Sequence, residues 1–146
     1  MTEISFHFNV ADRTDYVCRL LRKAVRREAR VMVTGSAPTL ASVDRALWSF
    51  DPLEFVPHVL LRSGEAVPAR LSAPPVGVVA EVGQAGDAAP HEVLVNLGTD
   101  APDGFQSFER LIEIVTSGDD DRAAARERWK HYAARGYAIE RHEVVA

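Results

Sequence analysis

The sequence predicts an α/β protein of three layers, in which an open, mostly parallel sheet carries helices on both faces. Residues 4–34 have the patterns of a strand, a helix and a second strand, the unit that places two parallel strands in one sheet. Valine-rich runs and a well-delimited helix continue the alternation toward the C-terminus. In a chain of 146 residues, a length typical of one domain, this alternation favours crossover helices that bury their apolar stripes against the strands. We therefore expect residues 1–146 to form a single domain.

Periodicity indicates each element of the first unit. Apolar and polar residues alternate over 4–10, as in a strand with one buried face. Over 12–29 the apolar residues recur at three- and four-residue intervals, which predicts an amphipathic helix capped by Asp12 or Thr14. The continuous apolar run within 30–34 is typical of a strand that is covered on both faces.

The middle of the chain is expected to hold a second helix, two strands and two loops. The loop 35–39 leads into the helix, for which Thr39 is the expected cap. Asp51 ends the helix, because Pro52 disfavours the helical conformation of the residue before it. The expected strands are 76–82 and 92–97, and the expected loops, which contain glycine and proline, are 62–75 and 83–90.

The C-terminal third predicts two helices and a strand. Large apolar residues recur at helical intervals over 105–115, which predicts a short apolar helix. The segment 119–135 begins with three aspartates, which favour the positive end of a helix dipole, and Gly136 after it is suited to a left-handed stop. Alternation over 137–145 predicts a final strand.

Composition narrows the function classes. A net charge of −4 argues against broad nonspecific nucleic-acid binding, which needs a basic field. The single cysteine, Cys18, allows no internal disulfide, which fits a reducing compartment. Because no segment approaches the roughly 20 apolar residues of a membrane span, we expect a soluble, cytoplasmic protein without a membrane partner.

The predicted sheet is Rossmann-like and invites a nucleotide hypothesis, but the nucleotide-binding fingerprint is absent. Residues 9–14, after the first strand, contain no glycine, so the backbone cannot approach a pyrophosphate. Ser36 lacks the motif of a strained nucleophile, and Cys18 lies in mid-helix, where burial raises the pKa of a thiol and makes it unreactive. The histidines have no recognised zinc spacing. We expect no catalytic residue, cofactor or metal.

Two segments instead have the composition of docking surfaces. The segment 43–58 concentrates aromatic residues, prolines and a histidine around a helix end, where one element cannot bury all the rings. On the late helix, Arg122, Arg126 and Trp129 fall on one stripe with Lys130 beside it, an arrangement that suits an acidic peptide with a hydrophobic end. The alternative is that Trp129 packs against the sheet while the arginines face water.

These segments also resemble a known family. The resemblance rests on Ala46-Leu47-Trp48 with Phe55-Val56-Pro57-His58, and on Ala125-Arg126-Glu127-Arg128-Trp129-Lys130 with Tyr132 and Gly136-Tyr137. In order and spacing they resemble the chi subunit of the bacterial DNA polymerase III holoenzyme over essentially the whole chain. The resemblance implies a noncatalytic clamp-loader accessory protein in DNA replication, whose nucleotide-binding-like fold binds no nucleotide.

The resemblance implies two partner surfaces. The acidic C-terminal tail of single-stranded DNA-binding protein is expected on the late helix, at Arg122, Arg126, Trp129, Lys130, Tyr132, Gly136 and Tyr137. The psi subunit, which bridges to the clamp loader, is expected at Trp48, Phe55, Pro57 and His58. DNA is then reached mainly through partners. The chain departs from the family pattern at Trp129, where a tyrosine is usual, and at Arg122, where a lysine can occur.

Two other hypotheses stay open at this point. One is a Rossmann-like enzyme or binding protein for a nucleotide or small molecule. The other is direct nucleic-acid binding through the first helix, where seven basic residues crowd 13–30, although solvated helix faces are the favoured explanation of such a cluster.

Overall fold

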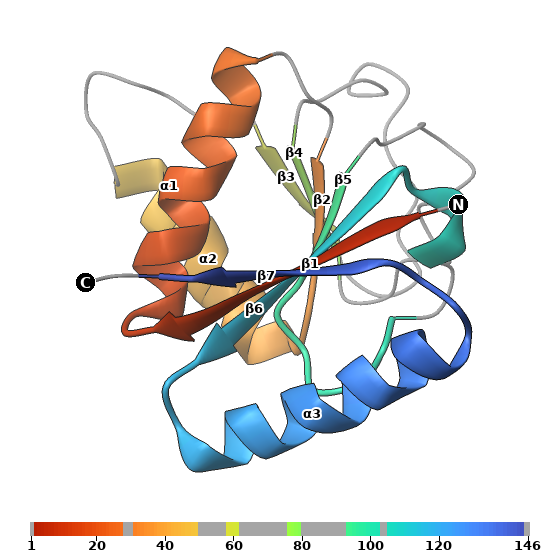
Figure 1. Ribbon diagram of the computed structural model, residues 1–146. Helices are drawn as coiled ribbons and strands as arrows, with labels where there is room; N and C mark the ends of the chain where they lie inside the picture. The colour runs from red at the N-terminus through yellow and green to blue at the C-terminus, as the bar shows by residue number, and fades with distance from the viewer. Residues whose placement is uncertain are drawn as a thin grey trace.

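The computed structural model describes residues 2–27, 31–49, 58–61, 76–79, 93–102 and 105–144, which form one sheet of seven strands with helices around it (Figure 1). The strand order is β3-β4-β2-β5-β6-β1-β7, and every described pairing is parallel. The elements in chain order are β1 (Glu3–Val10), α1 (Arg13–Arg26), β2 (Val31–Thr34), α2 (Ala37–Ser49), β3 (His58–Leu61), β4 (Val76–Val79), β5 (Val93–Asn96), the short 3-10 helix η3 (Phe105–Ser107), β6 (Arg110–Thr116), α3 (Asp119–Ala134) and β7 (Ile139–Glu143).

The helices cover both faces of the sheet, which confirms the predicted three layers. Figure 1 shows α1 and α2 on one face and α3 on the other. One apolar cluster joins the first face to residues such as Val17 and Leu21 of α1 and Val43 of α2. A second cluster joins the opposite face to α3 through Phe6 and Tyr132. No helix in the described ranges is both long and apolar enough to cross a bilayer.

The first crossover unit forms as predicted. The side chain of Asp12 accepts a hydrogen bond from the backbone N–H of Asp15 at 3.1 Å, which caps α1. All four residues of β2 are buried, because strands lie on both sides of it and helices cover the sheet. The cap predicted for α2 is wrong by three residues: Ser36 accepts the hydrogen bond of the Thr39 N–H at 3.4 Å, so the helix begins at Ala37.

The helix predicted over 105–115 is wrong. Residues Arg110–Thr116 form β6, which lies between β5 and β1 near the centre of the sheet, and η3 is the helical part of this segment. Five consecutive residues of β6 are buried because both faces of the strand are covered. A strand that is buried on both faces has no apolar period of its own, and here even Glu113 is buried, so the helical spacing of its large residues was coincidental.

The sheet also contains a strand that the sequence did not predict. β3 begins at His58, within the segment interpreted as a docking surface, and pairs with β4 at the edge of the sheet. The predicted loops 62–75 and 83–90 lie outside the described residues.

The end of α3 and the start of β7 follow the prediction. Gly136 has a φ of +82°, a left-handed conformation that favours glycine, and its N–H donates to the carbonyl of Ala133 at 3.1 Å. The chain then returns along β1 as β7, with Arg141 beside Phe6 in the pairing register.

Candidate functional site

A buried polar network holds α3 on the sheet. Glu113 of β6 has no exposed surface and accepts hydrogen bonds from the Tyr132 hydroxyl at 2.6 Å and from Asn96 Nδ2 at 2.8 Å. Arg128 places Nε 3.0 Å from Glu113 Oε2 and donates from Nη1 to the carbonyl of Thr99 at 2.9 Å. Because Arg128 and Tyr132 both come from α3, this network fixes the rotation of the helix and thus which stripe faces outward.

Burial sets the protonation of this network. It raises the pKa of Glu113, a rise that the Arg128 charge and the hydrogen bonds from Tyr132 and Asn96 oppose. Burial, followed by the nearby Glu113 carboxylate, raises the pKa of the Tyr132 hydroxyl well above its usual value. Tyr132 therefore keeps its proton and remains the donor to Glu113.

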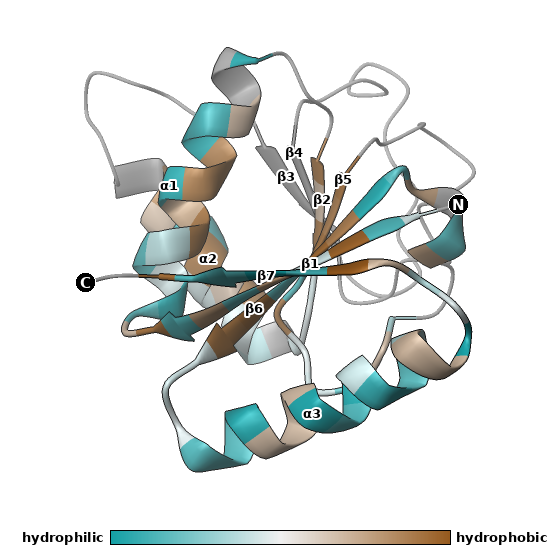
Figure 2. Ribbon diagram, in the orientation of Figure 1, coloured by the Kyte–Doolittle hydropathy of each residue, from teal (hydrophilic) through white to brown (hydrophobic). Residues whose placement is uncertain are grey.

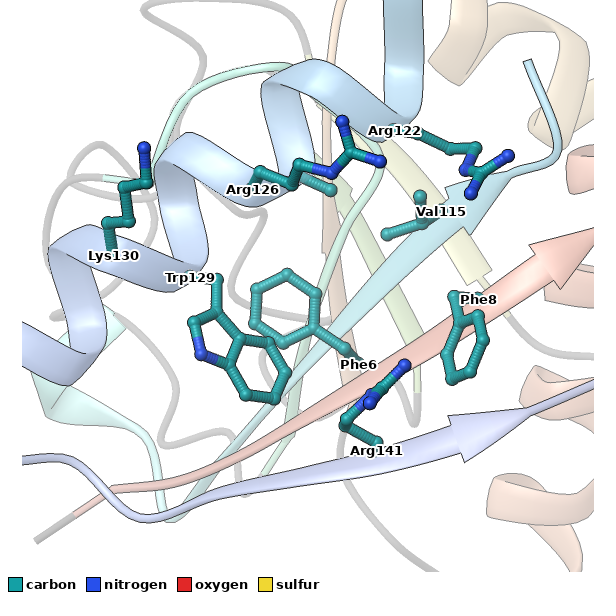
Figure 3. A pocket seen from close by; sticks show the side chains of 9 residues that line it. Phe6, Phe8, Val115, Arg122, Arg126, Trp129, Lys130 and Arg141 are labelled. Atoms are coloured by element: carbon teal, nitrogen blue, oxygen red, sulfur yellow. The ribbon is translucent and has the colours of Figure 1, made fainter. Parts of the chain in front are cut away.

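Beside its buried residues Arg128 and Tyr132, α3 forms one wall of a groove with a volume of about 510 Å³ (Figure 3). Apolar side chains from β1 and β6 lie between α3 and β7, and basic side chains stand on both sides of them. The lining residues are Phe6, Phe8, Val115, Arg122, Ala125, Arg126, Trp129, Lys130 and Arg141.

Trp129 connects the apolar floor to the basic wall. Its side chain is half-buried, and its ring centroid lies 5.1 Å from that of Phe6, with the planes tilted by 50°. The indole thus packs against the sheet and also lines the groove. The alternative interpretation of the stripe is confirmed in that Trp129 packs against the sheet while Arg122 and Arg126 are exposed. All three residues also line the groove, and peptide docking there stays a prediction.

The groove is a cationic site with an apolar floor. Its lining contains four cations, from Arg122, Arg126, Lys130 and Arg141, and no carboxylate. Lys130 lies 3.5 Å from Glu127, whereas the three arginines form no ion pair with any other residue that the structure describes. Figure 2 shows mostly hydrophilic residues along α3 and β7, in contrast to the hydrophobic residues of β2 and β5. Such a groove is suited to an anionic ligand that also carries apolar surface.

Arg141 and Phe8 line the groove but were not predicted as site residues from the sequence. The guanidinium carbon of Arg141 lies 5.0 Å from the centre of the Phe8 ring, a cation–π contact. The predicted alternation of the final strand already places Arg141 on the same face as Ile139, but its position opposite α3 depends on the pairing of β7 with β1.

The other residues predicted for tail binding lie outside the groove. Tyr132 is fully buried and hydrogen-bonded to Glu113, so it cannot touch a ligand and acts by positioning α3. Gly136 forms the turn after α3, and Tyr137 packs on Phe105 with ring centroids 5.3 Å apart.

The residues predicted for the second surface lie at the opposite edge of the sheet or outside the described residues. Trp48 is in the last turn of α2, and His58 is the first residue of β3, against which α2 packs. The side chains of Trp48 and His58, and residues Phe55 and Pro57 as a whole, lie outside what the structure describes.

The chain is similar to proteins of one known family. A family model described as "DNA polymerase III chi subunit, HolC" matches residues 1–140. The chain belongs to this family. It is therefore a replication accessory subunit of the DNA polymerase III type, as the resemblance implied.

Curated relatives named "DNA polymerase III subunit chi" span most of the chain. The protein from Pseudomonas aeruginosa is 28% identical, over 99% of this chain and 98% of that protein. The protein from Haemophilus influenzae is 30% identical, over 86% of this chain and 83% of that protein. The protein from Escherichia coli is 27% identical, over 84% and 80%.

Proposed function

We propose that this chain is a noncatalytic adaptor that links the replicative polymerase assembly to single-stranded DNA-binding protein by holding its acidic C-terminal tail in the groove between α3 and β7. The observation that carries the proposal is the charge pattern of the groove, four cations and no carboxylate around an apolar floor. The adaptor needs no cofactor, works in the cytoplasm and reaches DNA mainly through its partners.

The groove has a separate place for each part of such a tail. The arginines of α3 can grip carboxylates with two parallel hydrogen bonds, which a guanidinium forms better than an ammonium group. Phe6 and Trp129 offer ring surface to an apolar or aromatic residue at the end of the tail. A ligand with carboxylates alone, or with an apolar end alone, would not use both the cations and the aromatic rings that line the groove.

The second partner in the proposal is the psi subunit, bound as a heterodimer through Trp48, Phe55, Pro57 and His58, and through it the clamp loader. This part rests on the resemblance of that segment to the chi family. The sheet order is compatible with psi and the acidic tail binding at the same time, because β3 and β7 are the two edges of the sheet. A partner at the β3 edge therefore leaves the groove beside β7 open.

A peptide titration tests the groove. The probe is a fluorescent peptide with consecutive aspartates and an apolar, aromatic C-terminal end, followed by anisotropy. We expect Arg126→Ala to weaken binding about tenfold, which corresponds to about 1.5 kcal/mol for a charged hydrogen bond at an exposed side chain. Added salt should weaken binding to the unaltered chain, because exposed charges are screened.

Arg135→Ala is the matched control, because Arg135 is exposed at the end of α3 and does not line the groove. Equal affinities of the unaltered chain and the Arg126→Ala variant, or no binding at all, would show that the groove is wrongly assigned. Thermal stabilisation by a nucleotide and not by the peptide would favour the small-molecule alternative.

A further inference from the structure

The β7 side of the groove contains a cation that the helical stripe does not supply. Arg141 comes from a different element from Arg122 and Arg126, and Figure 3 shows it across Phe6 and Phe8 from those two arginines. In the pairing of β1 with β7, Arg141 is opposite Phe6, and neighbours in a parallel pair lie on the same face of the sheet. The position of Arg141 in the groove is thus fixed by the backbone.

The contact with Phe8 also orients the Arg141 side chain. An exposed arginine normally loses much rotational freedom when it binds a ligand. Here the guanidinium already lies over the Phe8 ring, 5.0 Å from its centre, and such stacking suits the planar guanidinium better than a lysine ammonium. Arg141 forms no ion pair with the residues that the structure describes, so its charge remains available to a ligand.

We propose that Arg141 is a specificity-determining residue, which makes the groove select ligands with two adjacent carboxylates. The inference rests on the proposed function. Successive side chains of an extended segment point in opposite directions. A peptide lying between α3 and β7 therefore directs one carboxylate to Arg122 or Arg126 and the next to Arg141. Acidic residues separated by one position point to the same wall and leave the other wall unused.

The test combines variants of the chain with variants of the peptide. We expect Arg141→Gln to weaken binding of the consecutive-aspartate peptide about fivefold, the effect of an exposed pair that is already oriented. Arg141→Lys keeps the positive charge but loses the planar guanidinium group. Its affinity for the peptide should therefore lie between that of the unaltered chain and that of Arg141→Gln. Arg135→Gln removes an exposed arginine outside the groove and should change affinity by less than about twofold.

The peptide variants test the adjacency itself. When alternate aspartates are replaced by asparagine, so that no two acids are adjacent, the unaltered chain should bind more weakly and Arg141→Gln should add no further loss. If Arg141→Gln binds the original peptide as Arg135→Gln does, while Arg126→Ala is still impaired, the inference is wrong and the proposed function stands. An equal loss with every peptide would mean that Arg141 adds only general positive charge, which also overturns the inference. If the unaltered chain binds no peptide, the proposed function and the inference fail together.

Discussion

Glu113 shows how a single residue outside the groove controls its shape. A carboxylate with no exposed surface inside a parallel sheet is destabilising unless its charge is paired and its oxygens are hydrogen-bonded. Arg128 supplies the opposite charge, and Tyr132 and Asn96 supply the hydrogen bonds. Because two of these partners lie on α3, the arginines on its neighbouring stripe are oriented by a residue that no ligand touches.

Glu113→Ala should therefore be among the more damaging substitutions. It leaves the Arg128 cation, which is 3% exposed, without its counter-charge. We expect the free energy of unfolding, measured in urea, to fall by about 3–5 kcal/mol. The exposed Glu109 provides the control, since Glu109→Ala should be nearly neutral.

Adding Arg128→Met to Glu113→Ala separates lost charge pairing from lost packing. The double variant should recover part of the stability, because the unpaired cation is removed along with the carboxylate. A Glu113→Ala protein within about 1 kcal/mol of the unaltered chain would contradict this account of the network.

Individual site residues were predictable where their spacing is local. Helical periodicity placed Arg122, Arg126, Trp129 and Lys130 together, and the structure has all four at the groove. Burial of Cys18 in mid-helix was also predicted, and desolvation raises the pKa of its thiol to about 11. The same helical spacing could not show that Tyr132 faces Glu113, because that contact depends on how α3 lies on the sheet.

At the scale of elements, the pairing of β1 with β7 contains a pH-sensitive contact. His7 of β1 is opposite His142 of β7, with ring centroids 4.8 Å apart, and shares a hydrogen bond with the Tyr16 hydroxyl of α1. Burial, His142 and Arg110 of β6 together lower the pKa of His7 to about 4. The folded chain thus favours the neutral imidazole.

The sign of the resulting pH dependence follows from proton uptake. Below the ordinary pKa of 6.5 the unfolded chain binds a proton at His7, whereas the folded chain does so only near 4. His7 therefore contributes a loss of stability as the pH falls from about 6.5 to about 4. Because the ring is only half-buried, solvent screening keeps this loss below the value for the full shift.

Urea unfolding at pH 7 and pH 5 measures the contribution. We expect the difference in unfolding free energy between the two pH values to be smaller for His7→Gln than for the unaltered chain. Gln106→Ala, at an exposed residue of η3 without a titratable side chain, is the control and should keep the original difference. An unchanged pH dependence in His7→Gln would mean that His7 does not titrate differently in the folded and unfolded chains.

Elements with ends marked in the sequence were predicted better than buried ones. α3 has aspartates in its first turn and glycine after its last, and β1 alternates, so both were placed within a few residues. β6 has neither signal, because burial on both faces removes the alternation that identifies a strand. β3 was missed for another reason: it begins inside the aromatic- and proline-rich segment that was interpreted as a docking surface, whereas the equally short β2, β4 and β5 stand out as valine-rich runs.

At the scale of the whole molecule, positive charge is local and not general. The chain has 17 basic and 21 acidic side chains, yet the groove collects four cations on one face of α3 and β7. Some cations of α1 are already engaged: Arg19 lies 3.1 Å from Asp15, and Arg13 donates to the carbonyl of Leu97 at 3.2 Å. These contacts favour the interpretation of α1 as a solvated basic face.

The chain should accordingly discriminate against bare DNA. At a salt concentration near physiological, we expect it to bind the acidic peptide but to show no affinity for a single-stranded oligonucleotide in the same anisotropy assay. Oligonucleotide affinity that falls steeply with salt and is reduced by Lys23→Gln, a change at an exposed residue of α1, would support the nucleic-acid hypothesis instead.

The strand order has a mechanical consequence if both edges of the sheet are attached to partners. Tension between the β3 edge and the β7 edge is directed across the strands, so all the strand pairings bear it in series. Near each edge a helix reinforces them: α2 packs on β3 and β4, and α3 spans β6 and β7. On the first face α1 packs on both α2 and β6 and so joins the two reinforced halves. The sheet therefore transmits force between its two edges, and its weakest point is expected at one of the four-residue pairings, of which the pairing of β2 with β5 lies near the middle of the sheet.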